Sequence, residues 1–255
     1  MTLHALTELA LRPWGRPMAG LVHHRTEERL VELQPSFPMP GPNHVCLVRC
    51  APERVGPMIR ETRELIASHG LRAIWILDPD ARPSDLPDRL ADHGISQVEE
   101  LQVMVLPAGA ELRPARPGIE IVDALRDEST FAAAEAVQAA AFGSGPAPRQ
   151  RDRFEEGRAE PARHFFMALV DGEPAGAGWA TVHAEGVQLN GGAVAPRFQG
   201  RGVYRAMLSA RLDLARREGA PGLVTQARPD TSAPILAGLG FTWVGRWAVY
   251  NDAPI

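Results

Sequence analysis

The chain has 255 residues, 45% of them hydrophobic and 23% charged, which is long enough for two modest hydrophobic cores. The formal net charge of −4 argues against a protein that binds nucleic acid by neutralising phosphates. No apolar run approaches the ~20 residues of a membrane span, and a start that contains Glu8 and lacks a basic region does not predict a signal peptide. We therefore expect neither a nucleic-acid partner nor a membrane partner.

The amino-terminal half predicts a strand beginning at His44, a helix ending at Gly70 and a buried strand over 71–79. Cys46 and Cys50 stand four apart on the first of these strands. Their spacing matches no common zinc pattern, so we interpret both as buried small hydrophobic residues and predict no metal site. The cysteines imply no disulfide framework, which is typical of a reducing cytoplasm.

Residues 106–118 (LPAGAELRPARPG) are rich in proline and glycine and predict an interdomain linker. We place the linker at 111–117. An amino-terminal domain then covers 1–110, and a carboxyl-terminal domain covers 118–255.

The carboxyl-terminal domain predicts a mixed order of strands and helices that leads to a glycine-rich loop. In order, these are a strand at 118–125, helices at 131–142 and 151–160, a hairpin over 164–186 turning near Asp171-Gly172, a strand at 187–196 and a helix after Gly202. A strand, a short helix and a last strand follow over 222–245. The pair Gly191-Gly192 interrupts the strand before the loop and predicts a β-bulge.

The loop itself is QGRGVY, Gln199 to Tyr204, between that strand and that helix. Glycines at the start of a helix leave backbone N–H groups uncovered, and the helix dipole adds partial positive charge there. The loop is therefore suited to a phosphate or pyrophosphate. It is neither a Walker loop, since no Lys-Ser/Thr follows Gly202, nor a dinucleotide fingerprint, since Arg205 stands where the third glycine is needed.

The segment VAPRFQGRGVYRAM resembles the strand–proline–loop–helix signature of the GCN5-related N-acetyltransferases (GNAT), in which a Gln or Arg is followed three residues later by Gly. Here those residues are Gln199 and Gly202. The family usually has Gly or Ala where this chain has Tyr204, whose ring must turn away from the phosphates. The resemblance covers 118–255 and implies a mixed α/β, acyl-CoA N-acyltransferase-like fold in which the bulged strand splays from its neighbour and forms the slot for acetyl-CoA.

The resemblance further implies an acetyl-CoA-dependent N-acetyltransferase that acts on a primary amine of a small molecule or protein. The cofactor-binding residues would lie on the bulged strand and the loop: Gly192, Ala193, Val194, Gln199, Gly200, Arg201, Gly202, Val203, Tyr204 and Arg205. A backbone N–H near Ala193 or Val194 would stabilise the oxyanion.

The amino-terminal half repeats part of this pattern. Residues 80–96 align without a gap under residues 226–242, and both segments contain Ala-Arg-Pro. We interpret the chain as two tandem copies with splayed central strands, although a chance match remains the alternative. The first copy has only Arg54-Val55-Gly56-Pro57 where the loop should stand, and proline lacks an N–H donor. We interpret it as a degenerate, structural copy without a cofactor loop.

No catalytic residue is predicted. The usual GNAT acid is a tyrosine five residues before the late Gly-Phe pair, and that position is Leu236; the two tyrosines are Tyr204 and Tyr250. His183 and Glu185 are more typical of a solvated hairpin than of a catalytic base, and Asn190 is no base. A second hypothesis therefore stays open, a non-catalytic acyl-CoA-binding or regulatory protein.

An acidic group, Asp152, Glu155 and Glu156, falls where the family borders its acceptor site. These carboxylates would attract a cationic amine, or they form a solvated helix face. The sequence predicts neither the acceptor amine nor the oligomeric state.

Overall fold

The computed structural model describes residues 6–7, 10, 19–37, 42–114, 116–145 and 147–252 and divides the chain into two compact units. Unit 1 holds Met104–Val244 with the described residues of 1–10. Unit 2 holds the described residues of 11–103 with those of 245–255.

These units differ from the domains expected at 1–110 and 118–255, because two strands each belong to both units. Strand β5 (Ile95–Pro107) begins in unit 2 and ends in unit 1, and β11 (Thr242–Asp252) begins in unit 1 and ends in unit 2. The expected linker also lies inside unit 1. Just before it, Arg216 donates hydrogen bonds of 2.9 Å and 2.7 Å to the carbonyl oxygens of Ala108 and Ala110.

Unit 2 contains the expected strand, helix and strand, with two additional strands before them and a short helix after them. Its elements are β1 (Val22–Arg25), β2 (Leu30–Leu33), β3 (His44–Cys46), the 3-10 helix η1 (Pro52–Arg54), α2 (Val55–Ser68), β4 (Ile74–Leu77) and α3 (Leu86–Asp92). Its strands hydrogen-bond in the order β1-β2-β3-β4-β11-β5, with β3 and β4 parallel. Strand β3 is shorter than predicted, because Leu47 takes a positive φ of 52° and ends it before Cys50. Cys46 and Cys50 are buried free thiols, and burial raises the pKa of each.

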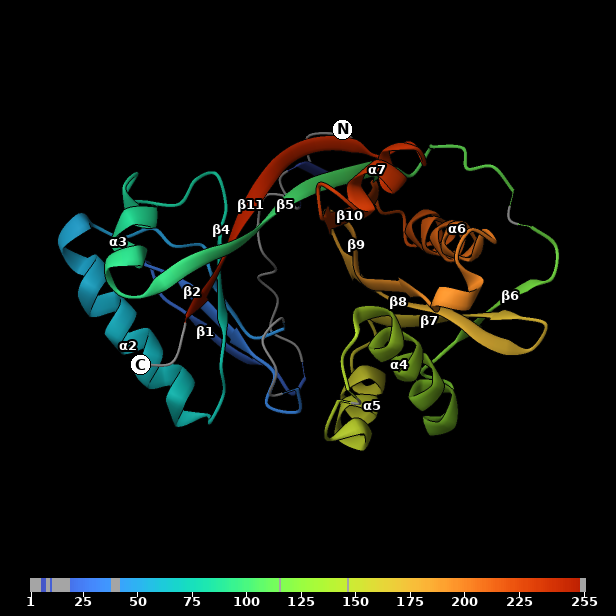
Figure 1. The fold of residues 1–255 in the computed structure, drawn as a ribbon, viewed down its shortest axis with the longest axis horizontal. Helices are drawn as coiled ribbons and strands as arrows, with labels where there is room; N and C mark the ends of the chain where they lie inside the picture. The colour runs from blue at the N-terminus through green and yellow to red at the C-terminus, as the bar shows by residue number, and fades with distance from the viewer. Residues whose placement is uncertain are drawn as a thin grey trace. The chain divides into compact units, whose positions relative to one another are not determined.

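Unit 1 follows the predicted order from its first strand onward. Its elements are β6 (Ile119–Asp123), α4 (Glu128–Phe142), α5 (Gln150–Ala159), β7 (Arg163–Val170), β8 (Glu173–His183), β9 (Gly186–Val194), the 3-10 helix η2 (Pro196–Phe198), α6 (Val203–Arg217), β10 (Gly222–Ala227) and α7 (Ser232–Ala237). The strands hydrogen-bond in the order β5-β10-β9-β8-β7-β6. Helix α6 covers one face of this sheet, and α4 and α5 cover the other (Figure 1).

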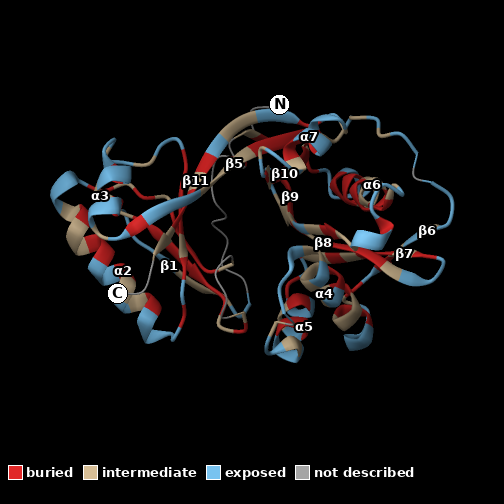
Figure 2. Ribbon diagram, viewed as in Figure 1, coloured by how far each residue is buried: buried red, intermediate tan, exposed pale blue. Residues whose placement is uncertain are grey.

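Both faces of the unit 1 sheet are packed with apolar side chains. On the α6 face, Leu208 and Leu212 join the cluster that contains Leu189 of β9. On the α4 face, Phe165 stacks on Trp179 with ring centroids 4.1 Å apart. Figure 2 shows buried segments in red on α6 and on the strands beneath it. Each fully buried large side chain contributes roughly 1.5–3 kcal/mol, which fixes α6 against β9.

The predicted bulge is present in β9. Ala177 of β8 pairs with Ala193, whereas Trp179 pairs with Asn190, so Gly191 and Gly192 together face one residue of β8. Gly191 has a φ of +56°, a left-handed conformation that glycine adopts without a steric penalty. The side chain of Gln138 on α4 donates a 2.5 Å hydrogen bond to the Gly191 carbonyl. The bulge is therefore held from the α4 side.

Strand β9 also separates from its parallel neighbour at this point. Residues 187–189 pair with residues 223–225 of β10, and no pairing with β10 follows for the described residues 190–194. The splayed pair of central strands is thus present, with the bulge at its opening. Within the described ranges, no helix is long and apolar enough to cross a bilayer.

Candidate cofactor site

The QGRGVY loop connects η2 to α6 through two left-handed glycines. Gly200 has a φ of +72°, and Gly202, the residue before the first turn of α6, has a φ of +87°. A side chain at either position is strained by the backbone conformation alone. The two glycines turn the chain sharply, so that the end of β9 leads directly into the start of α6.

The turn leaves a group of backbone donors without acceptors. Among the described residues, no hydrogen bond engages the N–H groups of Gly200, Gly202, Val203, Tyr204 and Arg205. The first intrahelical bond is donated by Ala206 to the Gly202 carbonyl at 3.1 Å. Because the dipole of α6 adds partial positive charge at the same place, the loop is suited to bind an anion.

A pocket of about 710 Å³ opens at this loop, between the start of α6, the end of β9 and α7. It brings together most of the residues predicted for the cofactor, namely Gly192, Val194, Gln199, Gly200, Gly202, Val203, Tyr204 and Arg205. Ala193 and Arg201 do not line it. Ala193 is buried beside the bulge, and the Arg201 guanidinium lies 5.4 Å from the centroid of the Phe198 ring.

The charged side chains that line the pocket are all cationic. They are Arg116 and Arg205, and the described lining residues include no carboxylate. Neither arginine forms an ion pair with another described residue, and the buried Nε of Arg205 has no hydrogen-bond partner. The pocket therefore presents unpaired positive charge beside the free N–H groups, an arrangement that favours a polyanionic ligand.

Arg116 was not predicted. It lies in the segment expected to be a linker, where a single arginine gives no recognisable motif. A methyl group at Gly202 would stand 3.6 Å from Cγ of Arg116, so this side chain packs directly on the loop.

Behind the pocket lies a second feature that sequence reasoning missed, the fully buried Arg211 of α6. Its Nε donates to the Met207 carbonyl at 3.1 Å, and its Nη1 and Nη2 find no acceptor among the described residues. Burial lowers the pKa of the Arg211 guanidinium. The Tyr204 side chain opposes this shift. Burying a cation without a counter-ion costs free energy, so the burial of Arg211 needs a physical explanation.

The remaining candidates lie outside the pocket. His183 and Glu185 stand at the hairpin between β8 and β9, at the far end of β8 from the bulge. Asn190 pairs with Trp179 across the strands. Leu236, at the usual position of the acid, is buried in the α7 core.

Of the acidic residues of α5, Asp152 and Glu155 are exposed and Glu156 is half-buried. Asp152 accepts a 2.7 Å hydrogen bond from Arg149. Burial lowers the pKa of the Arg163 guanidinium, and the charge of Glu156 opposes that shift. Arg163 lies over the Trp179 ring, 4.4 Å from its centroid.

Among the described residues, no group of three or more His, Cys, Asp or Glu side chains is arranged to hold a metal ion.

The loop, the bulge and most of the pocket lining fall within a segment that matches a known family. Residues 128–237 match the acetyltransferase (GNAT) family. This segment is therefore similar to a GNAT domain. A curated relative, mycothiol acetyltransferase of Streptomyces griseus subsp. griseus, is 34% identical over 155 residues, which is 56% of this chain and 46% of that protein. The chain thus matches about half the length of this relative.

Solved structures show that the GNAT-like fold extends over the whole chain. A GCN5-related N-acetyltransferase from Kribbella flavida aligns with 100% of this chain and 97% of its own, at a TM-score of 0.72 and 16% identity. A tandem GNAT protein from the clavulanic acid biosynthesis pathway aligns with 98% of this chain and 93% of its own, at a TM-score of 0.58 and 15% identity. The mixed α/β fold with tandem copies is therefore the fold of this protein.

Proposed function

We propose that this protein is an acetyl-CoA-dependent N-acetyltransferase that transfers the acetyl group to a primary amine of a small molecule or protein. The observation that carries the proposal is the loop at residues 199–202. It presents free N–H groups and two unpaired arginines to a pocket at the opening of a splayed, bulged strand.

The residues present fit coenzyme A. The N–H groups of the loop and of the first turn of α6 would hold the pyrophosphate, and Arg116 and Arg205 would pair with phosphate oxygens. Gly192 and Val194 would line the slot for the pantetheine arm. When bound, acetyl-CoA supplies an activated thioester carbonyl.

The chain's own contribution to the reaction is to orient the thioester and to stabilise charge. We expect a backbone N–H of Ala193 or Val194 to donate to the carbonyl oxygen as the amine attacks. Because a lysine-like amine has a pKa of about 10.4 in water, the acceptor site must also favour its neutral form. The acidic residues of α5 would attract the cationic amine before this step.

We further propose that unit 2 is a degenerate copy of the same unit and serves a structural role. The order β3-η1-α2-β4-α3-β5 repeats the order β9-η2-α6-β10-α7-β11, with parallel strands before and after the first helix in each case. The free cysteines of unit 2 and the use of acetyl-CoA favour a cytoplasmic location.

A non-catalytic acyl-CoA-binding role is the second candidate, and the observation that favours it is the burial of Leu236 at the usual acid position. Two measurements separate the candidates. Acetyl-CoA at a hundredfold excess over its Kd should stabilise the protein by about 2.7 kcal/mol, and NAD or ATP should do much less. Equal stabilisation by ATP would contradict the coenzyme A assignment.

The second measurement is the release of free thiol from acetyl-CoA in the presence of a panel of amines. We expect release with at least one amine, whereas stabilisation without turnover by any amine would favour the binding role.

A further inference from the structure

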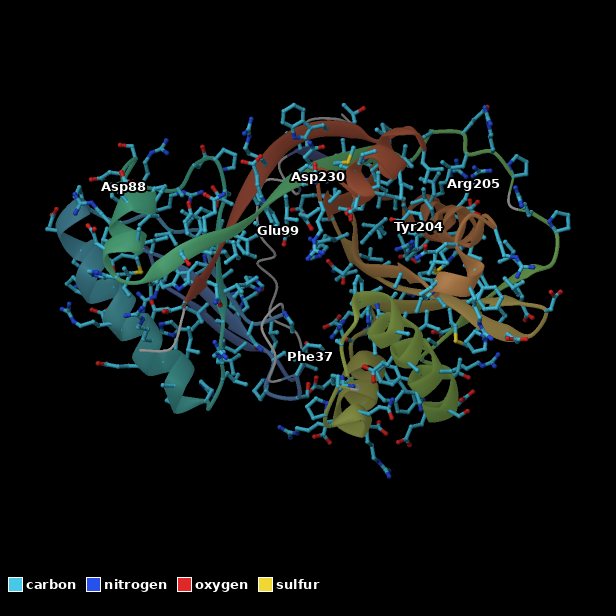
Figure 3. All side chains as sticks on the ribbon, in the orientation of Figure 1. Phe37, Asp88, Glu99, Tyr204, Arg205 and Asp230 are labelled. Carbon is cyan, nitrogen blue, oxygen red and sulfur yellow. The ribbon has the colours of Figure 1, made fainter. Side chains whose placement is uncertain are left out.

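The structure places a tyrosine hydroxyl at the bulge, although the usual acid position holds a leucine. A methyl group at Gly192 would stand 3.1 Å from Cε2 and 3.6 Å from the hydroxyl oxygen of Tyr204. The Tyr204 ring thus lies against Gly192, which has no side chain to displace it. Figure 3 labels Tyr204 and Arg205, neighbours at the start of α6 that both line the pocket.

Arg211 lies directly behind this ring. Its Cζ is 5.7 Å from the centroid of Tyr204, and methyl groups at Gly178 and Gly192 would stand 3.0 Å and 3.6 Å from its Nη1. Two glycines of neighbouring strands therefore make room for one guanidinium. This space depends on glycine at position 178, because a Cβ there would require the guanidinium to shift.

The charges around Tyr204 all favour negative charge on its oxygen. Arg211 and Arg205 of α6 and Arg116 of the preceding segment are cationic, and the β8, β9 and α7 residues that face the pocket or the ring carry no titratable side chain. A buried cation without a carboxylate partner is stabilised most when a neighbouring group becomes anionic. Negative charge that develops on the Tyr204 oxygen during a proton transfer would therefore lie beside Arg211.

We propose that Tyr204 is the acid that protonates the departing thiolate of coenzyme A, and that Arg211 is a positioning residue that holds the Tyr204 ring against the bulge and stabilises the tyrosinate. This inference rests on the proposed function. The amine nitrogen forms a bond to the acetyl carbon, the carbon–sulfur bond breaks, and the electron pair stays on sulfur. The Tyr204 hydroxyl gives its proton to that sulfur. The proton that the amine nitrogen loses returns through solvent to the tyrosinate, so that the enzyme is restored.

The test uses coenzyme A and the full chain. Because the sequence contains only two tyrosines, Tyr250→Phe leaves Tyr204 as the single tyrosine and serves as the matched control. The thiolate absorbance of bound coenzyme A is titrated with pH, and the same titration with desulfo-coenzyme A, which lacks the thiol, is subtracted. We expect the bound thiol of the parent and of Tyr250→Phe to have a pKa about one unit or more below the free value of about 8.5.

Tyr204→Phe should bind coenzyme A within about threefold of the parent but should restore most of the free thiol pKa, because the hydrogen-bond donor to sulfur is lost. Arg211→Met, which fills a similar volume without charge, should reduce the shift while it retains coenzyme A binding. With an amine that supports turnover, Tyr204→Phe should lower kcat by roughly ten- to a hundredfold and leave the KM for acetyl-CoA nearly unchanged.

The outcomes are distinct. A lowered thiol pKa that persists in Tyr204→Phe, or a thiol pKa equal to the free value in the parent, overturns the assignment of Tyr204 and leaves the proposed function standing. No binding of coenzyme A by the parent overturns the proposed function, and this inference with it.

Discussion

The two units start their central helices in different ways. In unit 2 the 3-10 helix η1 ends at Arg54, and α2 begins at the next residue, Val55. In unit 1 the residues from Gln199 to Gly202 separate η2 from α6. The element order around these helices is otherwise the same. The difference teaches that a single short loop can open or close the start of a helix within one architecture.

The donors at the two helix starts differ accordingly. The N–H of Val55 already donates to the Pro52 carbonyl, and Pro57 has no N–H to offer. Gly56 packs close to the ring of His93, since a methyl group there would stand 3.2 Å from its Nε2. At the start of α2, one donor is bonded, Pro57 has none and Gly56 is covered by His93, whereas the start of α6 is open.

Within the described part of the chain, the arginines near the two helix starts also differ, because the one in unit 2 is paired with carboxylates and those that line the pocket of unit 1 are not. In unit 2, Arg54 donates hydrogen bonds of 2.9 Å to both carboxylate oxygens of Glu28 and also binds Glu61. These bonds lower the pKa of the Glu28 carboxyl, so the cation is neutralised by its neighbours. In unit 1, Arg116 and Arg205 have no such partners among the described residues. A phosphate would be attracted to one helix start and not to the other.

The largest expected effect is a loss of stability at a buried leucine that occupies aligned positions in the two units. The gap-free alignment places Leu90 of α3 under Leu236 of α7, and both side chains are buried in the cores of their units. Leu90→Ala and Leu236→Ala should each destabilise the protein by about 2–5 kcal/mol, because each leaves a cavity. Urea unfolding of both variants checks this expectation. Acetyl-CoA affinity of the folded variants should stay within about threefold of the parent, since no phosphate contact is assigned to either leucine.

The next largest effect should come from the loop. Gly202→Val places a β-branched side chain at a φ of +87° beside the phosphates, with strain on the order of 1–3 kcal/mol. Acetyl-CoA binding should weaken roughly ten- to a hundredfold. Gly56→Ala at the start of α2 is the matched control and should leave the affinity unchanged. If folded Gly202→Val binds acetyl-CoA as the parent does, the loop does not hold the cofactor.

A smaller, salt-dependent effect should follow from the arginine pair. Arg116→Gln removes one unpaired cation and should weaken acetyl-CoA binding by about tenfold at low ionic strength. The loss should shrink as salt screens the interaction. Arg54→Gln in unit 2 should not change the affinity at any salt concentration. Calorimetry at two ionic strengths distinguishes these cases, and a loss that is independent of salt would contradict a phosphate contact of Arg116.

Much of the fold could be predicted because local patterns and tertiary structure agree in unit 1. The hairpin at Asp171-Gly172 and the bulge at Gly191-Gly192 rest on glycine conformations that sequence reveals directly. The division of β5 and β11 between the units could not be predicted. The alternation of apolar and polar residues along a strand does not show which neighbouring strands pair with each of its ends.

The geometry of the candidate site was predicted where it rests on backbone conformation, and it was missed where it rests on isolated side chains. Arg116 has no local signal. Arg211 had one: it stands four residues after Met207 and four before Ala215, which places it on the apolar face of α6. An arginine at an apolar position of a helix indicates that its guanidinium is buried. Gly178 and Gly192 leave the space that this buried guanidinium occupies.

The most direct test of the contrast between the units is a calorimetric titration of the full chain with acetyl-CoA. Unit 1 has an open loop, a cationic pocket and a splayed strand, and unit 2 has a covered helix start with its arginine already paired. We predict one acetyl-CoA bound per chain, and loss of that same binding event in Gly202→Val. A stoichiometry of two, or a single site that Gly202→Val leaves intact, would contradict the account.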